Sequence, residues 1–135
     1  MKTKSLKRAV IILLILVPAG FMTKFYQGPA EQWVNNHLGG VFYVSFLTIL
    51  LYILLTFWKN LKVIYPVLAA LIITTVLEFL QLWETPVLEA IRNTFLGRTI
   101  IGSSFNPEDF IYYVLGSALA YFLILWCKKE TNKPF

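Results

Sequence analysis

The chain has 135 residues, of which 58 % are hydrophobic and 14 % are charged. Soluble domains carry roughly 25 % charged residues, and a chain this short cannot bury so much apolar surface around one core in water. The composition therefore argues against a soluble globular enzyme and a disordered chain, and the single cysteine, Cys127, excludes a disulfide scaffold. The sequence predicts one all-α integral membrane domain over residues 1–135.

Four apolar segments approach or reach the length of about 20 residues that a membrane-spanning helix needs. They cover residues 9–25, 41–58, 63–83 and 109–127. Trp58, Trp83 and Trp126 each fall at an expected helix end, where an amphipathic ring favours the headgroup level. The first segment has an alternative interpretation as a cleaved signal peptide, because it has a basic start and small residues placed like a cleavage site.

Basic residues gather in three groups beside the ends of these segments. The groups are Lys2, Lys4, Lys7 and Arg8, then Lys59 and Lys62, then Lys128, Lys129 and Lys133. Such clusters mark the cytoplasmic face of a membrane protein, and Lys24, Arg92 and Arg98 are exceptions to the rule here. We therefore expect a multi-pass protein of the bacterial cytoplasmic membrane, with both termini cytoplasmic. The same distribution argues against nucleic-acid binding, although the net charge is +5.

Two loops are expected outside, over residues 26–40 and 84–108. Within the second, Leu88, Ile91 and Phe95 recur at helical spacing, which predicts a short interfacial helix over residues 87–96. Pro86 suits the first turn of this helix and Gly97 its C-terminal cap.

The main anomaly is a polar stripe in the third apolar segment. Thr74, Glu78 and Gln81 follow each other at i, i+4 and i+7, so they share one helix face. A carboxylate inside a spanning helix costs on the order of 2.5–3.5 kcal/mol unless it reaches water or a partner. Intramembrane ionisable groups are functional sites by default, but the same stripe would also serve as a strut that pins the outer segment to the bundle.

Partners for Glu78 are expected on the neighbouring outer segments. Arg92 and Arg98 are the nearest cations in sequence, and we expect Glu78 within salt-bridge or one-water distance of one of them. Asp109 can reach the same layer from the start of the fourth helix, together with Tyr112 or Tyr113. The candidate site residues are Glu78, Gln81, Arg92, Arg98, Asp109 and Thr74.

Other chemistry-bearing residues carry weaker signals. His37 is the single histidine and is expected to be a surface loop residue, and Cys127 is expected to pack in the bundle. Gly116 and Ala120 form a small-xxx-small pair that allows close helix contact. We find no ligand cluster with metal-binding spacing, no phosphate-binding glycine loop and no catalytic triad order in the sequence, so no metal or cofactor is expected.

A distinctive pattern of residues covers positions 78–109. It contains Glu78-Phe79-Leu80-Gln81-Leu82-Trp83, Leu88 to Thr94, Leu96-Gly97-Arg98, Gly102, Phe105-Asn106 and Asp109. With this pattern, residues 37–125 resemble a bacterial membrane-protein family of unknown function that is similar to the VanZ-like proteins. VanZ-like proteins share a Glu-x-x-Gln, a following Arg, and an Asp that opens a later helix ahead of a Gly. The residues of this chain that match that pattern are Glu78, Gln81, Arg92 or Arg98, Asp109 and Gly116. The chain departs from it at Gly40, where many relatives have an Asp. The resemblance implies a four-helix membrane protein and an association of the wider group with glycopeptide-antibiotic resistance, but no biochemical activity.

Three functions are compatible with these observations. The polar cluster could bind a lipid headgroup or another amphiphile at the outer leaflet, since arginine suits phosphate or carboxylate groups. It could instead be internal to an accessory subunit that binds other membrane proteins. In a small enzyme acting on a lipid-linked phosphate or sugar, Glu78 and Asp109 would be the candidate acid and base. The sequence leaves the oligomeric state and the choice between these functions open.

Overall fold

The computed structural model describes residues 2–56, 62–82, 85–100 and 107–131, with side chains described in 4–56, 62–82, 85–98 and 107–128. All regular structure in these residues is helical, so the predicted all-α class is confirmed for them. The helices are α1 (Lys2–Phe25), α2 (Glu31–Trp33), the π-helical η1 (Val34–Leu38), α3 (Gly39–Leu55), α4 (Ile64–Leu80), α5 (Pro86–Arg92), α6 (Phe95–Ile100) and α7 (Asp109–Thr131).

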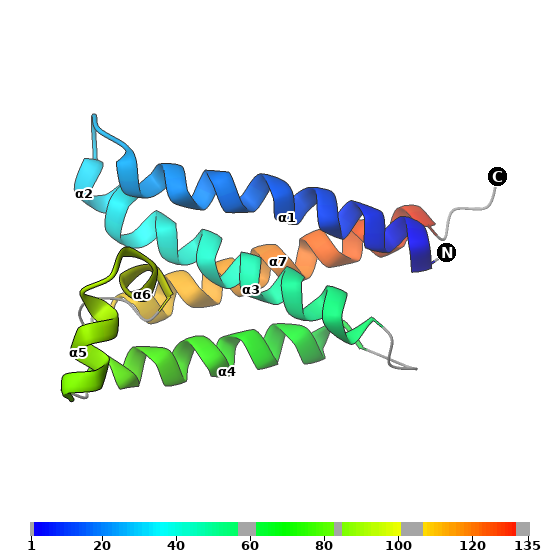
Figure 1. Cartoon of the computed structure of the whole chain (residues 1–135). Coiled ribbons are helices and arrows are strands. Elements are labelled where there is room, and N and C mark those ends of the chain that lie inside the picture. Colours follow the sequence, from blue (N-terminus) through cyan, green and yellow to red (C-terminus); the bar gives the residue numbers. More distant parts are fainter. Residues whose placement is uncertain (1, 57–61, 83–84, 101–106, 132–135) are drawn as a thin grey trace.

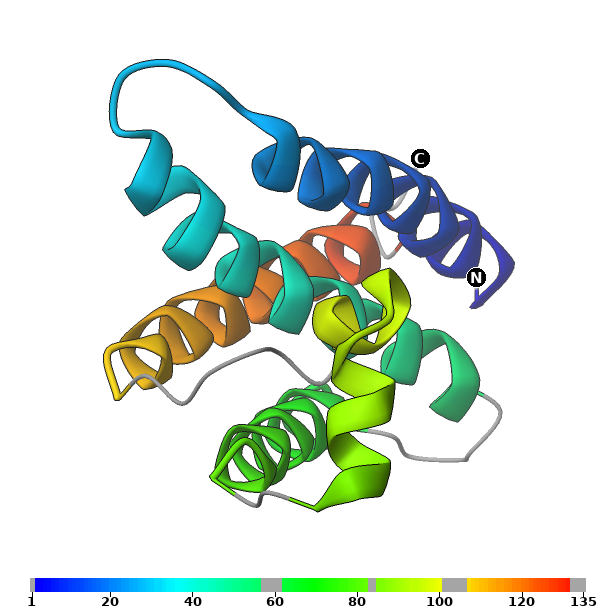
Figure 2. The same ribbon diagram turned by 60° about the vertical axis from the view of Figure 1, so that its left-hand side comes forward.

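The four long helices α1, α3, α4 and α7 form a bundle (Figure 1). Helix α3 packs against α1, α4 and α7, and α7 also packs against α1 and α4. The start of α1 and the end of α7 lie together at one end of the bundle, here called the basic end, where α3 ends and α4 begins (Figure 1). The short helices α5 and α6 pack against each other at the opposite end, here called the polar end (Figure 2).

Three helical stretches are long and apolar enough to cross a membrane. They are Lys4–Phe25, Glu31–Leu55 and Asp109–Lys128. Helix α4 has 17 residues and therefore spans about 26 Å, slightly less than the roughly 30 Å hydrocarbon core of a bilayer. The three apolar helices suggest a multi-pass membrane protein, whereas a fourth crossing by α4 stays a prediction.

The expected outer loop over residues 26–40 is wrong in its second half. A helix begins at Glu31 and continues through η1 into α3 without a break. Gly39 and Gly40 lie within this helix, where they allow close contact with neighbouring helices. A Cβ atom on Gly39 would lie 3.2 Å from the Thr23 hydroxyl, and one on Gly40 would lie 3.4 Å from the Tyr113 ring. The turn is confined to residues before Glu31, where Ala30 has a left-handed φ of 58°.

The predicted helix over residues 87–96 is confirmed only as far as Arg92, because the chain forms two short helices in this region. Helix α5 begins at Pro86, where the Thr85 hydroxyl accepts a hydrogen bond of 3.2 Å from the Leu88 amide. It ends at Arg92, and Phe95 begins α6. Gly97 lies inside α6 instead of capping a helix. Its backbone approaches the carbonyl of Ile91 so closely that a Cβ atom at this position would collide with it. Whether α5 and α6 lie at the membrane interface stays a prediction.

The buried interior changes character along the bundle. Toward the basic end it holds an apolar cluster of Ala9, Leu16, Ile49, Tyr52, Val63 and Ile124. Toward the polar end the buried side chains are largely polar. Among them are Ser45, Thr48, Thr74, Glu78 and Ser117, which are 0–4 % exposed. The polar half of this interior positions the candidate site.

Candidate functional site

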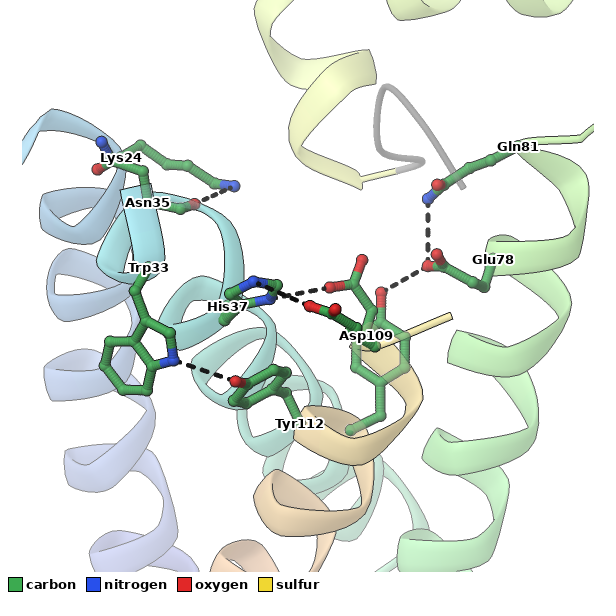
Figure 3. Close-up of polar contacts among 10 residues, drawn as sticks. Lys24, Trp33, Asn35, His37, Glu78, Gln81, Asp109 and Tyr112 are labelled. Carbon is green, nitrogen blue, oxygen red and sulfur yellow. Dashed lines mark hydrogen bonds and ion pairs between the residues drawn. The ribbon is translucent and has the colours of Figure 1, made fainter. Parts of the chain in front are cut away.

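Glu78 is the centre of the polar end. It lies in the last turn of α4 and is fully buried at 0 % exposure. The Tyr113 hydroxyl of α7 donates a hydrogen bond of 2.8 Å to Glu78 Oε2, and the Gln81 amide donates one of 3.4 Å to the same atom (Figure 3). The expected approach of Tyr113 to this layer is therefore confirmed. A hydrogen bond to a charged acceptor is worth about 1.5–3 kcal/mol, so Tyr113 couples α7 to α4.

Arg92 reaches the same helix end but contacts the backbone. Its Nη2 atom donates a hydrogen bond of 2.6 Å to the carbonyl oxygen of Leu80. The last carbonyls of a helix lack intrahelical donors and carry the negative end of its dipole, so a guanidinium is favoured there. Arg92 thereby links α5 to α4. Arg98, by contrast, is exposed on α6. Pairing of Glu78 with either arginine stays a prediction.

His37 forms a second polar group beside the first. Its Nδ1 atom lies 3.5 Å from Asp109 Oδ1 and its Nε2 atom lies 3.6 Å from Glu108 Oε2 (Figure 3). Its ring stacks on Tyr112 at 4.6 Å between centroids, and the Trp33 indole donates a 3.0 Å hydrogen bond to the Tyr112 hydroxyl. The expectation of a surface histidine is wrong, because the His37 side chain is only 15 % exposed and faces two carboxylates.

The misplacement of this histidine follows from the expected loop over residues 26–40, because a continuous helix begins at Glu31 instead. His37 lies in η1, whose wider turn belongs to the helix that continues into α3. A reading of residues 31–55 as one helix would have placed His37 at the polar end beside the start of α7.

Helix α7 brings the two polar groups together. Asp109 and Tyr113 are one turn apart, so they share a face of α7. Asp109 lies close enough to Glu78 and Lys24 to interact with both charges electrostatically. Lys24 also donates a 3.2 Å hydrogen bond to the carbonyl oxygen of Asn35. The polar end is thus one layer contributed by α1, η1, α4 and α7.

Thr74 lies one turn below this layer. It is 1 % exposed, and its hydroxyl donates to the carbonyl oxygens of Ala70 and Leu71, each at 3.0 Å. Four of the residues predicted from sequence therefore lie in or next to one layer, namely Glu78, Gln81, Asp109 and Thr74. Arg92 lies at the edge of this layer, and Arg98 is exposed.

Comparison with known proteins identifies a family but no characterised relative. The profile of a family described as "Protein of unknown function (DUF2809)" matches residues 29–117, which include η1, α3, α4 and the first part of α7. No curated protein and no solved structure matches the chain. The matched region contains every residue of the polar layer except Lys24.

Proposed function

The chain belongs to the DUF2809 family of proteins of unknown function, and we propose that its polar end binds the headgroup of a membrane lipid or another amphiphile. One observation carries this proposal, namely the complete burial of Glu78 among hydrogen-bond donors at the end of apolar helices. A buried carboxylate in such a helix is costly and is usually retained for a ligand, an ion or a proton. A headgroup at the membrane surface is the polar ligand nearest to this layer.

The cellular setting is part of the same proposal. Three basic groups at one end favour a cytoplasmic location for both termini, which places the polar end at the outer leaflet of a bacterial cytoplasmic membrane. The pattern of Glu78, Gln81 and Asp109 supports a relationship to the VanZ-like proteins.

A structural role in a larger membrane complex is the second candidate. It is favoured by contacts that close within the chain, because Tyr113 bonds to Glu78 and Asp109 lies against His37. Such contacts would hold α3, α4 and α7 in register without any ligand, and lipid-facing surfaces would bind other membrane proteins.

Lipid retention by variants tests the proposal. The purified protein is reconstituted in nanodiscs of mixed lipids, released into detergent, and analysed for retained lipid by native mass spectrometry. We expect Glu78→Gln to lose the retained lipid, because the charge that binds the headgroup is gone. Glu89→Gln is the matched control, since Glu89 is an exposed carboxylate at the same end. If Glu78→Gln lowers only the unfolding temperature and retains lipid like the parent, the site is a strut and the proposal fails.

A further inference from the structure

A second polar layer lies beneath Glu78, between α3, α4 and α7. Thr74 and Ser117 each lie one turn further into the bundle than Glu78 and Tyr113, a step of about 6 Å. Ser45 of α3 reaches the same depth, because its hydroxyl donates a 3.0 Å hydrogen bond to the carbonyl oxygen of Gly116. Thr74, Ser117 and Ser45 are 1 %, 4 % and 0 % exposed, so this hydroxyl layer is enclosed.

The hydroxyl layer, formed by Thr74, Ser117 and Ser45, presents more hydrogen-bond acceptors than donors to a ligand. The Thr74 and Ser45 protons are directed at backbone carbonyls, so their oxygen lone pairs are left to face a ligand. The Ser117 hydroxyl has no hydrogen-bond partner among the residues that the structure describes, although it is buried. An unsatisfied buried hydroxyl costs about 1–3 kcal/mol, which a bound ligand would recover.

The layer above it is rich in carboxylates. The described acidic residues at the polar end are Glu31, Glu78, Glu89, Glu108 and Asp109. The described cationic residues there are Lys24, Arg92 and Arg98. Carboxylates from α4 and α7 meet above acceptor hydroxyls, and a ligand for this place must therefore carry positive charge and several donors.

We propose that the polar end binds a primary ammonium group, as carried by phosphatidylethanolamine and other amine-headed amphiphiles. The ammonium lies between the Glu78 carboxylate and the hydroxyls of Thr74 and Ser117, and its three N–H donors match these acceptors. It replaces the Gln81 amide at Glu78, whose 3.4 Å hydrogen bond is longer than the usual 2.7–3.2 Å. This inference rests on the proposed headgroup binding and names the chemistry of the headgroup.

Methylation of the amine tests the inference directly. Nanodiscs of phosphatidylglycerol receive phosphatidylethanolamine or phosphatidylcholine with the same acyl chains, and lipid occupancy is titrated by native mass spectrometry. We expect phosphatidylethanolamine to bind about tenfold more tightly, equivalent to about 1.4 kcal/mol, because a trimethylated amine has no N–H donor. Glycerophosphoethanolamine, added as a soluble competitor, distinguishes a free amine from a lipid. Displacement shows that the headgroup alone is sufficient, and failure to displace shows that the acyl chains are also needed for binding. The amine itself is tested by the preference for phosphatidylethanolamine over phosphatidylcholine.

Two nearly isosteric variants locate the ammonium. Thr74→Val and Ser117→Ala should each remove most of the preference for phosphatidylethanolamine without destabilising the fold, and Ser117→Ala should raise the unfolding temperature of the lipid-free protein, because it removes an unsatisfied buried hydroxyl. The matched control is Thr75→Val, since the Thr75 hydroxyl also bonds to a carbonyl of α4, that of Leu71 at 2.7 Å, but points from a neighbouring face. Unchanged preference in both test variants would overturn the placement.

The outcomes separate the inference from the proposed function. If both lipids bind equally and Glu78→Gln abolishes both, the ammonium is wrong and headgroup binding stands. If phosphatidylglycerol binds most tightly in a manner that depends on Glu78, the ligand is anionic and the ammonium is again wrong. If no lipid depends on Glu78, both proposals fail.

Discussion

The two ends of the bundle are built on different physical principles. At the basic end, described cations such as Lys4, Lys7 and Lys62 surround a core packed from apolar side chains. Its polar contacts include the 2.7 Å hydrogen bond between the Ser5 and Tyr52 hydroxyls and the Arg8 guanidinium, which lies over the Trp126 ring. At the polar end, carboxylates, hydroxyls and a histidine occupy the positions where the other end has aliphatic carbon.

Under the proposed headgroup binding, this difference separates the part of the molecule that stabilises the fold from the part that recognises a ligand. Apolar packing tolerates changes that conserve volume, whereas a buried polar network loses stability whenever one member is left unpaired. On that proposal the basic end is the scaffold, and the polar end holds the recognition groups, which cost stability wherever one of them is left unpaired.

The two ends are expected to face different compartments. We expect Gln32→Cys to react with a membrane-impermeant maleimide added to intact cells, and Lys62→Cys to react only after the membrane is opened. Both residues are exposed, at the polar and basic ends respectively, and native Cys127 is buried and contributes little background. Labelling of Lys62→Cys in intact cells, with Gln32→Cys protected, would invert the assignment of the two ends.

The next effect concerns the contact between α3 and α7. A Cβ atom on Gly116 would collide with Val44 and lie 2.6 Å from the carbonyl oxygen of Val41, so Gly116→Ala must push the helices apart. Overpacking of this kind costs about 1–3 kcal/mol, which unfolding in mixed micelles would measure. Gly20→Ala is the control, because its nearest contact would be an ordinary 3.6 Å to Phe42. Equal stability of the two variants would show that α3 and α7 do not meet at Gly116.

The smallest effect compares one tyrosine hydroxyl at each end. Tyr113→Phe removes a hydrogen bond to a buried carboxylate and should cost about 1.5–3 kcal/mol in the same unfolding assay. Tyr52→Phe removes the buried bond to Ser5, which is between neutral groups, and should cost about 0.5–1.5 kcal/mol. A larger loss at Tyr52 than at Tyr113 would contradict the view that the polar end carries the costlier network.

The helices were predictable because both their apolar segments and the polar residues at their ends can be recognised in the sequence. The start of α7 at Asp109 and of α5 at Pro86 follow from capping chemistry. The approach of Tyr113 to Glu78 followed from placing both near the same end of adjoining helices. These features depend on local spacing, which a single sequence records.

What escaped prediction depends on contacts between distant segments. His37 was expected in a loop over residues 26–40, yet Gly39 and Gly40 admit neighbouring side chains within a continuous helix. The contact of Arg92 with the Leu80 carbonyl was missed because every residue has a carbonyl, so a backbone acceptor leaves no mark in the sequence. The break between α5 and α6 similarly depends on how closely Gly97 approaches Ile91.

The apolar cluster beneath the hydroxyl layer has an electrical consequence. The buried side chains there include Ala9, Leu16, Ile49 and Ile124, which offer no ligand to a hydrated ion. Moving an isolated charge through such a low-dielectric region costs roughly tens of kcal/mol. The apolar cluster is therefore a barrier to charge, and a charged ligand that enters at the polar end is expected to leave by the same end. Vesicles that contain the protein should hold a proton gradient as long as vesicles without it.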